Sequence, residues 1–166
     1  RRAGLEVHAD GLVVLADQDR SRWDRRLIAE GQAIVMQCLR WNRPGPYQIQ
    51  AAINAVHSDA PAAADTDWRQ ILQLYNQLLT LAPGPVVALN RAVAVAEVEG
   101  ADAALTLVDG LDLGRYYLFH AIRADLLRRL GRNAEAALAY DAAIARTGNT
   151  TEREFLQRRL QALSRP

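Results

Sequence analysis

Small and apolar residues between Tyr117 and Thr150 recur at helical spacing on both sides of a glycine. Small residues stand at Ala124, Ala136 and Ala143, and Gly131 sits between two runs that carry no helix breaker. The pattern predicts one helix, a tight turn at Gly131 and a second helix. Such a hairpin cannot bury its apolar face alone, so we expect further helices to be stacked on it.

The same periodicity predicts helices along nearly the whole chain. After an extended start that contains Leu12 to Leu15, Ser21 and Asp24 resemble a capping box for a first helix that ends near Arg40. A second helix follows over about 47–58. Apolar side chains at Ile49, Ile53 and Val56 are expected to face its interior side.

Proline and glycine mark the ends of the middle helices. Asp65 or Thr66 is expected to cap a third helix, and Pro83-Gly84 to end it. Pro85 suits the first turn of a fourth helix that runs to Gly100. The predicted apolar stripe of this fourth helix is Val86, Leu89, Val93 and Ala96.

A short fifth helix is predicted over about 101–108, and an eighth helix begins after Asn149, which we expect to cap it together with Glu152. Apolar residues of the eighth helix should cover the open end of the stack. They are Phe155, Leu156, Leu160 and Leu163.

The spacing within the 117–150 hairpin is that of a tetratricopeptide repeat. We therefore predict an all-α fold of antiparallel helix hairpins, stacked as a tetratricopeptide-like right-handed α-solenoid of about eight helices. The chain is expected to form one domain, 1–166. Its parts are an extended lead-in over 1–18, motif-bearing helices over 19–82, repeat-like hairpins over 83–148 and a capping helix over 149–164.

Composition narrows the classes of function. The 20 basic residues, all arginine, are interleaved with 19 acidic ones, so the net charge is only +1 and no concentrated phosphate-binding patch is visible. The absence of lysine indicates a GC-rich bacterial source. A lone Cys38 among apolar residues favours a buried thiol and a reducing, cytoplasmic compartment. The start at Arg1-Arg2 suggests a piece of a longer protein.

Catalytic and metal-binding patterns are weak. The sequence shows no glycine-rich phosphate loop, and His8, His57 and His120 lie far apart without a second ligand at metal-binding spacing. His57 is best explained as a solvated or capping histidine. We therefore expect no enzyme activity, no metal and no cofactor.

Four clusters rise above the background of a helical scaffold: DQDRSRWD at 17–24, GPYQIQAAINAVH at 45–57, DTDW at 65–68 and LNRAVAV at 89–95. Each also has a structural explanation, as a helix cap, a solvated polar face or a packed aromatic ring. Asn90 places an amide on an apolar face, where it would either tie two helices together or face a groove.

In this order the four clusters, followed by RADLLRRLGRNAEA at 123–136, resemble the carboxy-terminal tetratricopeptide-repeat extension of bacterial extracytoplasmic-function RNA polymerase sigma factors, of the sigma-70 family and sigma-24-like. The resemblance covers roughly Leu12 to Leu163. The promoter-reading regions 2 and 4, which lie upstream in such proteins, are not in this sequence. The resemblance implies a helical domain that controls or supports transcription initiation by contacting sigma regions 2 and 4, core RNA polymerase or a regulator. Promoter DNA would be reached only through the missing regions, and no membrane is involved.

We expect the partner-binding residues to come from the four clusters, with Trp23, Tyr47 and Trp68 as aromatic anchors of the contact. They are Asp17, Gln18, Asp19, Arg20, Trp23, Asp24, Tyr47, Gln48, Gln50, Asp65, Trp68, Asn90 and Arg91. Within this set, one contact surface is hypothesised to contain Asp19, Arg20, Gln48, Gln50 and Arg91. An alternative function is a sensor that binds a small molecule or peptide in the groove of the helices.

Overall fold

The computed structural model describes residues 7–8, 11–12, 18–40 and 45–163, and for 7–8, 11–12 and 38–40 it describes the backbone alone. Residues Val13 to Leu15 of the predicted extended start, the site candidate Asp17 and the Cys38 thiol therefore lie outside what is described.

Eight α-helices account for most of the described residues, which confirms the predicted all-α class. They are α1 (Arg25–Arg40), α2 (Pro46–Asp59), α3 (Trp68–Leu81), α4 (Pro85–Val98), α5 (Ala101–Asp109), α6 (Tyr117–Arg129), α7 (Asn133–Ile144) and α8 (Thr150–Leu163). Two 3₁₀ turns, η2 (Arg20–Arg22) and η3 (Ala63–Asp65), and two short strands, β1 (Val7–His8) and β2 (Gly11–Leu12), complete the elements. The strands pair antiparallel, with Val7 opposite Leu12.

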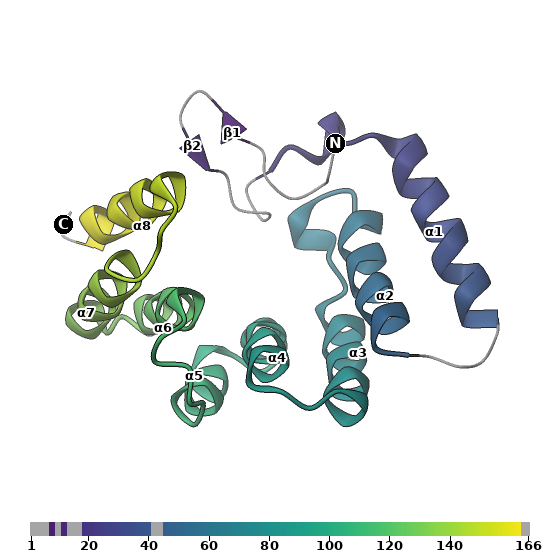
Figure 1. Ribbon diagram of the computed structural model, residues 1–166. Coiled ribbons are helices and arrows are strands. Elements are labelled where there is room, and N and C mark those ends of the chain that lie inside the picture. The colour runs from purple at the N-terminus through teal and green to yellow at the C-terminus, as the bar shows by residue number, and fades with distance from the viewer. Residues whose placement is uncertain (1–6, 9–10, 13–17, 41–44, 164–166) are drawn as a thin grey trace.

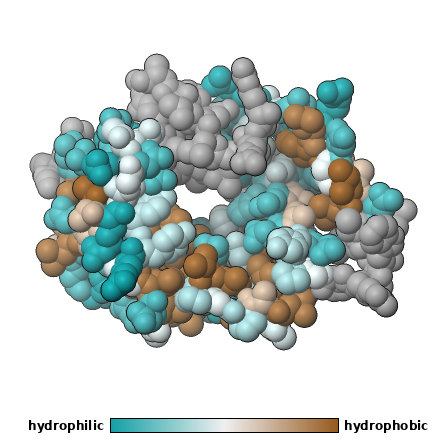
Figure 2. Space-filling model, in the orientation of Figure 1, coloured by the Kyte–Doolittle hydropathy of each residue, from teal (hydrophilic) through white to brown (hydrophobic). Residues whose placement is uncertain are grey.

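Each helix packs against the next one in the chain, from α1 on α2 to α7 on α8. The helices follow an arc from α1 to α8, and β2 contacts α8 at one end of that arc (Figure 1). The space-filling view shows a hollow at the centre of the same face (Figure 2). This arrangement is α-solenoid-like, because most of the packing joins helices that are neighbours in sequence.

Alanine and medium-sized aliphatic side chains fill the core. Its largest fully buried side chains are Ile49, Ile53, Ile71, Leu89, Val95, Val108 and Leu127. Between them lie buried alanines on α4, α5, α6 and α7: Ala92, Ala94, Ala96, Ala104, Ala124, Ala136, Ala139 and Ala143. Small side chains let neighbouring helix axes approach closely, so these positions set the tight pairing of the hairpins.

The predicted turn between α6 and α7 is present. Gly131 has φ 73°, in the left-handed region that favours glycine. Its N–H donates to the carbonyl of Arg128 at 3.0 Å, and the N–H of Arg132 donates to the carbonyl of Leu127 at 2.9 Å. This pair of bonds is the Schellman motif, which closes a helix and reverses the chain.

Helix α8 covers the end of the stack as predicted. Leu156 is buried, and Phe155, Leu160 and Leu163 pack against the core. Asn149 caps the helix by accepting from the N–H of Thr151 at 2.9 Å. The Glu152 carboxylate does not complete a capping box; it accepts hydrogen bonds from the hydroxyls of Tyr117 and Thr147, both at 2.7 Å.

Two predicted helix starts are wrong by a few residues. Helix α1 begins after Asp24, whose carboxylate accepts from the N–H groups of Arg26 and Leu27, while Ser21 belongs to η2. Helix α3 is capped by Asp67, which accepts from the N–H of Gln70 at 2.9 Å, and not by Asp65 or Thr66. In both segments an earlier polar residue forms a 3₁₀ turn and the last aspartate takes the capping position.

Helix α4 begins at Pro85 as predicted, but its buried stripe is rotated from the predicted one. Leu89 and Ala96 are buried, whereas Val86 is 44% exposed and Val93 is half-buried. The additional buried residues of α4 are Ala92, Ala94 and Val95. This helix packs against both α3 and α5, so a wider face is covered than a single stripe provides.

Membrane insertion of a helix finds no support in the part of the chain that is described, where none of the helices combines the length and the apolar character that a bilayer span needs.

We predict that Gly131→Ala lowers the free energy of unfolding by about 1–2 kcal/mol, because an L-residue is strained in the left-handed region. A Cβ at this position meets no atom within 4 Å, so the cost comes from the backbone and not from a clash. Urea denaturation measures the change. Gly148→Ala is the matched control, since Gly148 also has open space but no positive φ, and it should change stability by less than about 0.5 kcal/mol. Equal effects of the two substitutions would refute this explanation.

Candidate partner-binding site

Three of the four sequence clusters meet at the carboxyl end of α2. Arg20 of η2 reaches this end with its guanidinium, and the residue is 4% exposed. Its Nη1 donates to the backbone carbonyls of His57 and Ala60, both at 2.8 Å, and its Nη2 donates to the Thr66 hydroxyl at 3.2 Å. Arg20 therefore joins the 17–24 cluster to α2 and to the loop before α3.

The position of Arg20 suits its charge. The carboxyl end of a helix carries partial negative charge on its unpaired carbonyl groups, and a cation there is stabilising. Burial lowers the pKa of Arg20, and the nearby Asp65 carboxylate opposes that shift. A planar guanidinium can serve several acceptors at once, which a single ammonium group cannot do with the same geometry.

Two aromatic contacts are found in this region, and one of them involves Arg20. The guanidinium of Arg20 lies 5.1 Å from the centre of the Trp23 ring, within the range of a cation–π contact. The His57 ring packs edge-on against Trp68, with ring centres 5.1 Å apart. Trp23 and Trp68, predicted as anchors for a partner, are half-buried against residues of this chain.

The prediction that His57 is solvated or a helix cap is wrong. Its Nδ1 is buried and has no hydrogen-bond partner among the described residues. Desolvation lowers the pKa of His57, and the positive charge of Arg20 lowers it further. Both effects favour the neutral form of the histidine. The contact between the His57 and Trp68 rings could have been suggested from the sequence only by their positions, one near the end of a predicted helix and the other at the start of the next.

Other predicted residues of the first cluster have structural roles. Gln18 is 7% exposed, so it and Arg20 lie in the interior and not on an outer contact surface. Asp19 is exposed and accepts hydrogen bonds from the N–H and the hydroxyl of Ser21, at 3.0 and 2.6 Å. Asp24 caps α1, as described above.

Tyr47 and Gln48 lie at the opposite end of α2. Ten residues separate Tyr47 from His57, or about 15 Å along the helix axis. Tyr47 is 89% exposed, and Gln48 accepts a hydrogen bond from the N–H of Gly45 at 3.1 Å. Gln50 is half-buried and hydrogen-bonds the Tyr75 side chain, whose pKa is raised by burial.

The fourth cluster stays apart from the other three, on α4. Arg91 donates from Nε to the Asn76 amide oxygen at 2.6 Å and so joins α4 to α3. Asn90 is half-buried, and no hydrogen bond ties its amide to another described residue. The hydrogen bond that joins two helices is thus made by Arg91, the neighbour of Asn90. That Asn90 faces a groove stays a prediction. The hypothesised single surface of Asp19, Arg20, Gln48, Gln50 and Arg91 is not assembled.

A groove lies between α1, α2 and α3, with a volume of about 620 Å³. The sequence predicts a groove but neither its position nor its lining. Apolar side chains contribute much of its lining, and three aspartates stand among them. The lining residues are Gln32, Val35, Met36, Ala52, Ala55, Val56, Asp59, Ala60, Pro61, Asp65, Asp67, Gln70 and Leu74. Of the predicted site residues, Asp65 is in this set.

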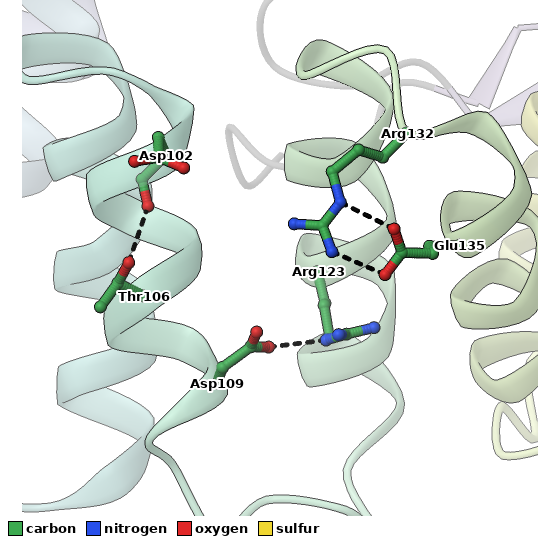
Figure 3. Close-up of polar contacts among 6 residues, drawn as sticks. All are labelled: Asp102, Thr106, Asp109, Arg123, Arg132 and Glu135. Atoms are coloured by element: carbon green, nitrogen blue, oxygen red, sulfur yellow. Dashed lines mark hydrogen bonds and ion pairs between the residues drawn. The ribbon is translucent and has the colours of Figure 1, made fainter.

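Charged side chains on α5, α6 and the start of α7 pair with one another (Figure 3). Arg123 contacts Asp109 at 2.7 Å, and Arg132 donates to both oxygens of Glu135 at 2.8 and 2.6 Å. The hydrogen bond from Arg132 lowers the pKa of Glu135. This charged surface is balanced within itself.

Metal binding has no support in the described residues, where no three His, Cys, Asp or Glu side chains are grouped closely enough to hold an ion.

We predict that Arg20→Lys lowers the free energy of unfolding by about 2 kcal/mol, because hydrogen bonds from a buried charged donor are lost and the acceptors stay buried. Urea denaturation at neutral pH measures the effect. Arg69→Lys on the exposed side of α3 is the matched control and should be within about 0.5 kcal/mol of the wild type. A loss no larger than that of the control would contradict the bridging role of Arg20.

We also predict that His57 makes stability depend on pH. The pKa of His57 is below its ordinary value of 6.5 in the folded state, so below pH 6.5 the unfolded chain binds a proton that the folded chain takes up only at lower pH. The free energy of unfolding should therefore fall as the pH decreases from about 7.5 to about 5.5. His57→Phe keeps a ring against Trp68 and should weaken this dependence. The same pH slope in both proteins, measured by urea denaturation, would argue against it.

The chain was compared with family models and with curated proteins. No family model matches it. It is 46% identical over 166 residues to an uncharacterized protein of Rhizobium meliloti (strain 1021), in an alignment that covers 98% of this chain and 39% of that protein. The chain thus spans about two fifths of the length of the relative that it matches.

Proposed function

We propose that this chain is the protein-interaction domain of a bacterial extracytoplasmic-function sigma factor and that it controls or supports transcription initiation in the cytoplasm. Its partner would be sigma region 2 or 4 of the same protein, core RNA polymerase or a regulator. The observation that carries the proposal is the groove between α1, α2 and α3, at the end of an arc of stacked helices. Helical repeat domains use their extended surfaces for binding other macromolecules.

The ordered set of clusters supports the sigma-factor part of this proposal. Three of those clusters converge on Arg20, and this gives their residue types a shared structural purpose. The length of the relative in Rhizobium meliloti also suits the proposal, because most of that protein lies outside the matched segment and could hold further domains.

The experiment that tests the proposal is promoter-dependent transcription by the full-length relative and by a variant that lacks the matched segment. We expect deletion to change the transcript yield at the relative's promoter at least several-fold. A decrease would mean that the domain assists initiation, and an increase would mean that it restrains it. An unchanged yield would refute the proposed role in transcription. Binding of the 166-residue chain to purified regions 2 and 4 and to core polymerase, measured separately, would identify the partner.

A ligand sensor is the second candidate function. The groove volume of about 620 Å³ is within the range of small-molecule sites. A thermal-shift screen against metabolites distinguishes the two functions, since a ligand that binds the folded state raises the melting temperature with its concentration.

A further inference from the structure

Helix α1 is held less firmly than the other helices. Over residues 25–37, where its side chains are described, none is buried, whereas each of α2 to α8 has at least one buried side chain. Leu27, Ile34 and Met36 are among the exposed large hydrophobic residues of the chain. An end helix of a repeat array is expected to present a polar outer face. Helix α1 exposes these apolar side chains in addition to polar ones, so apolar surface is left available beside α2.

The groove next to α1 combines an apolar floor with negative charge. Val35, Val56 and Leu74 come from three different helices and meet there. Asp59, Asp65 and Asp67 also line it, and its described lining contains no arginine, lysine or histidine. Figure 2 shows hydrophobic side chains over α1 and the adjoining part of α2.

Two of the three carboxylates accept hydrogen bonds from groups that carry no charge, and the third lies near a buried arginine. Asp59 accepts a hydrogen bond from the Gln32 amide at 3.0 Å, and Asp67 caps α3. The positive charge near Asp65 is Arg20, which is buried and shared among backbone carbonyls. On α5 to α7, by contrast, Asp109 forms an ion pair with Arg123 and Glu135 forms one with Arg132. None of the three carboxylates forms an ion pair with another described residue, so the groove keeps a negative charge at its surface.

We propose that this groove binds an amphipathic α-helix that carries lysine or arginine beside its apolar face. Such a helix complements both the floor and the carboxylates of the groove, and this is the helix-in-groove mode of recognition. Met36 lines the groove and is 57% exposed, so the apolar surface continues out of the groove onto α1, as an elongated partner requires. The inference rests on the proposed protein-interaction role and names the chemistry of its partner.

The direct test uses a fluorescent leucine/lysine amphipathic peptide of about 14 residues, or roughly 21 Å when helical, which matches the length of α2. Fluorescence anisotropy measures its binding to the 166-residue chain. The variant Asp59→Asn/Asp65→Asn/Asp67→Asn removes three charges, and asparagine keeps the capping role at position 67. We expect this variant to bind at least about tenfold more weakly and to lose most of the salt dependence of binding.

The matched control removes three carboxylates elsewhere. Glu99→Gln/Asp112→Asn/Asp141→Asn changes exposed residues outside the groove and raises the net charge by the same amount. It should bind the peptide within about twofold of the wild type. An equal loss in the two variants would mean attraction to net charge alone and would overturn the proposal.

Two further measurements keep the test decisive if the triple variant folds poorly. Met36→Ser alters an exposed side chain and should also weaken binding. Hydrogen exchange with the peptide bound should slow at the amides of α1, and slowing confined to other helices would overturn the proposal.

Two other ligands separate the possible occupants. A leucine/glutamate peptide of the same length should fail to bind. Spermidine at the same concentration should not displace the leucine/lysine peptide. If it does, the groove binds small cations, and the proposal of a helical partner is overturned. Since these assays contain no polymerase, they can succeed while the transcription test fails, and the reverse also holds.

Discussion

The burial of each helix by its neighbours in sequence is the constraint on which this structure depends. A single helix of 9 to 16 residues is at best marginally stable in water, and its stability comes from covering an apolar face. Buried alanines on α4 to α7 allow the covering helix to come close, and a larger side chain there would push the pair apart. The position of every loop and surface follows from this pairing.

Arg20 holds the segment before α1 against the helices that follow it. It reaches the carboxyl end of α2 from a segment that precedes α1, and it holds the approach to α3 through Thr66. The conspicuous residues around it, with two tryptophans and several aspartates, first suggest an exposed recognition motif. Their contacts show that much of this chemistry serves the inside of the molecule. The outer surface that results is shaped by plainer residues, such as Val35, Met36 and Val56.

The fold was largely predictable from the sequence, because helical periodicity and the glycine and proline breakers act locally. Gly131 and Pro85 each determine a helix boundary by backbone geometry alone. The cap at Asp67 was missed since three polar residues in a row can all cap a helix, and tertiary packing of Thr66 decides among them. The position and lining of the groove could not be predicted, because Gln32, Asp59 and Leu74 approach one another only through the packing of three helices. The lowered pKa of His57 likewise depends on burial by packing and on an arginine that is distant in sequence.

The two ends of the arc are anchored unequally, and this has a consequence for cooperativity. At the α8 end a buried leucine is supported by hydrogen bonds from Tyr117 and Thr147 to one carboxylate. Helix α1 has a hydrogen bond from Gln32 to Asp59, which is exposed, and none of its described side chains is buried. In a quasi-one-dimensional array the free energy of local opening varies with the interfaces of each unit, so fraying should begin at α1 and decrease toward α8. The helix that opens at the lowest free energy is therefore expected to be α1, which is one wall of the groove.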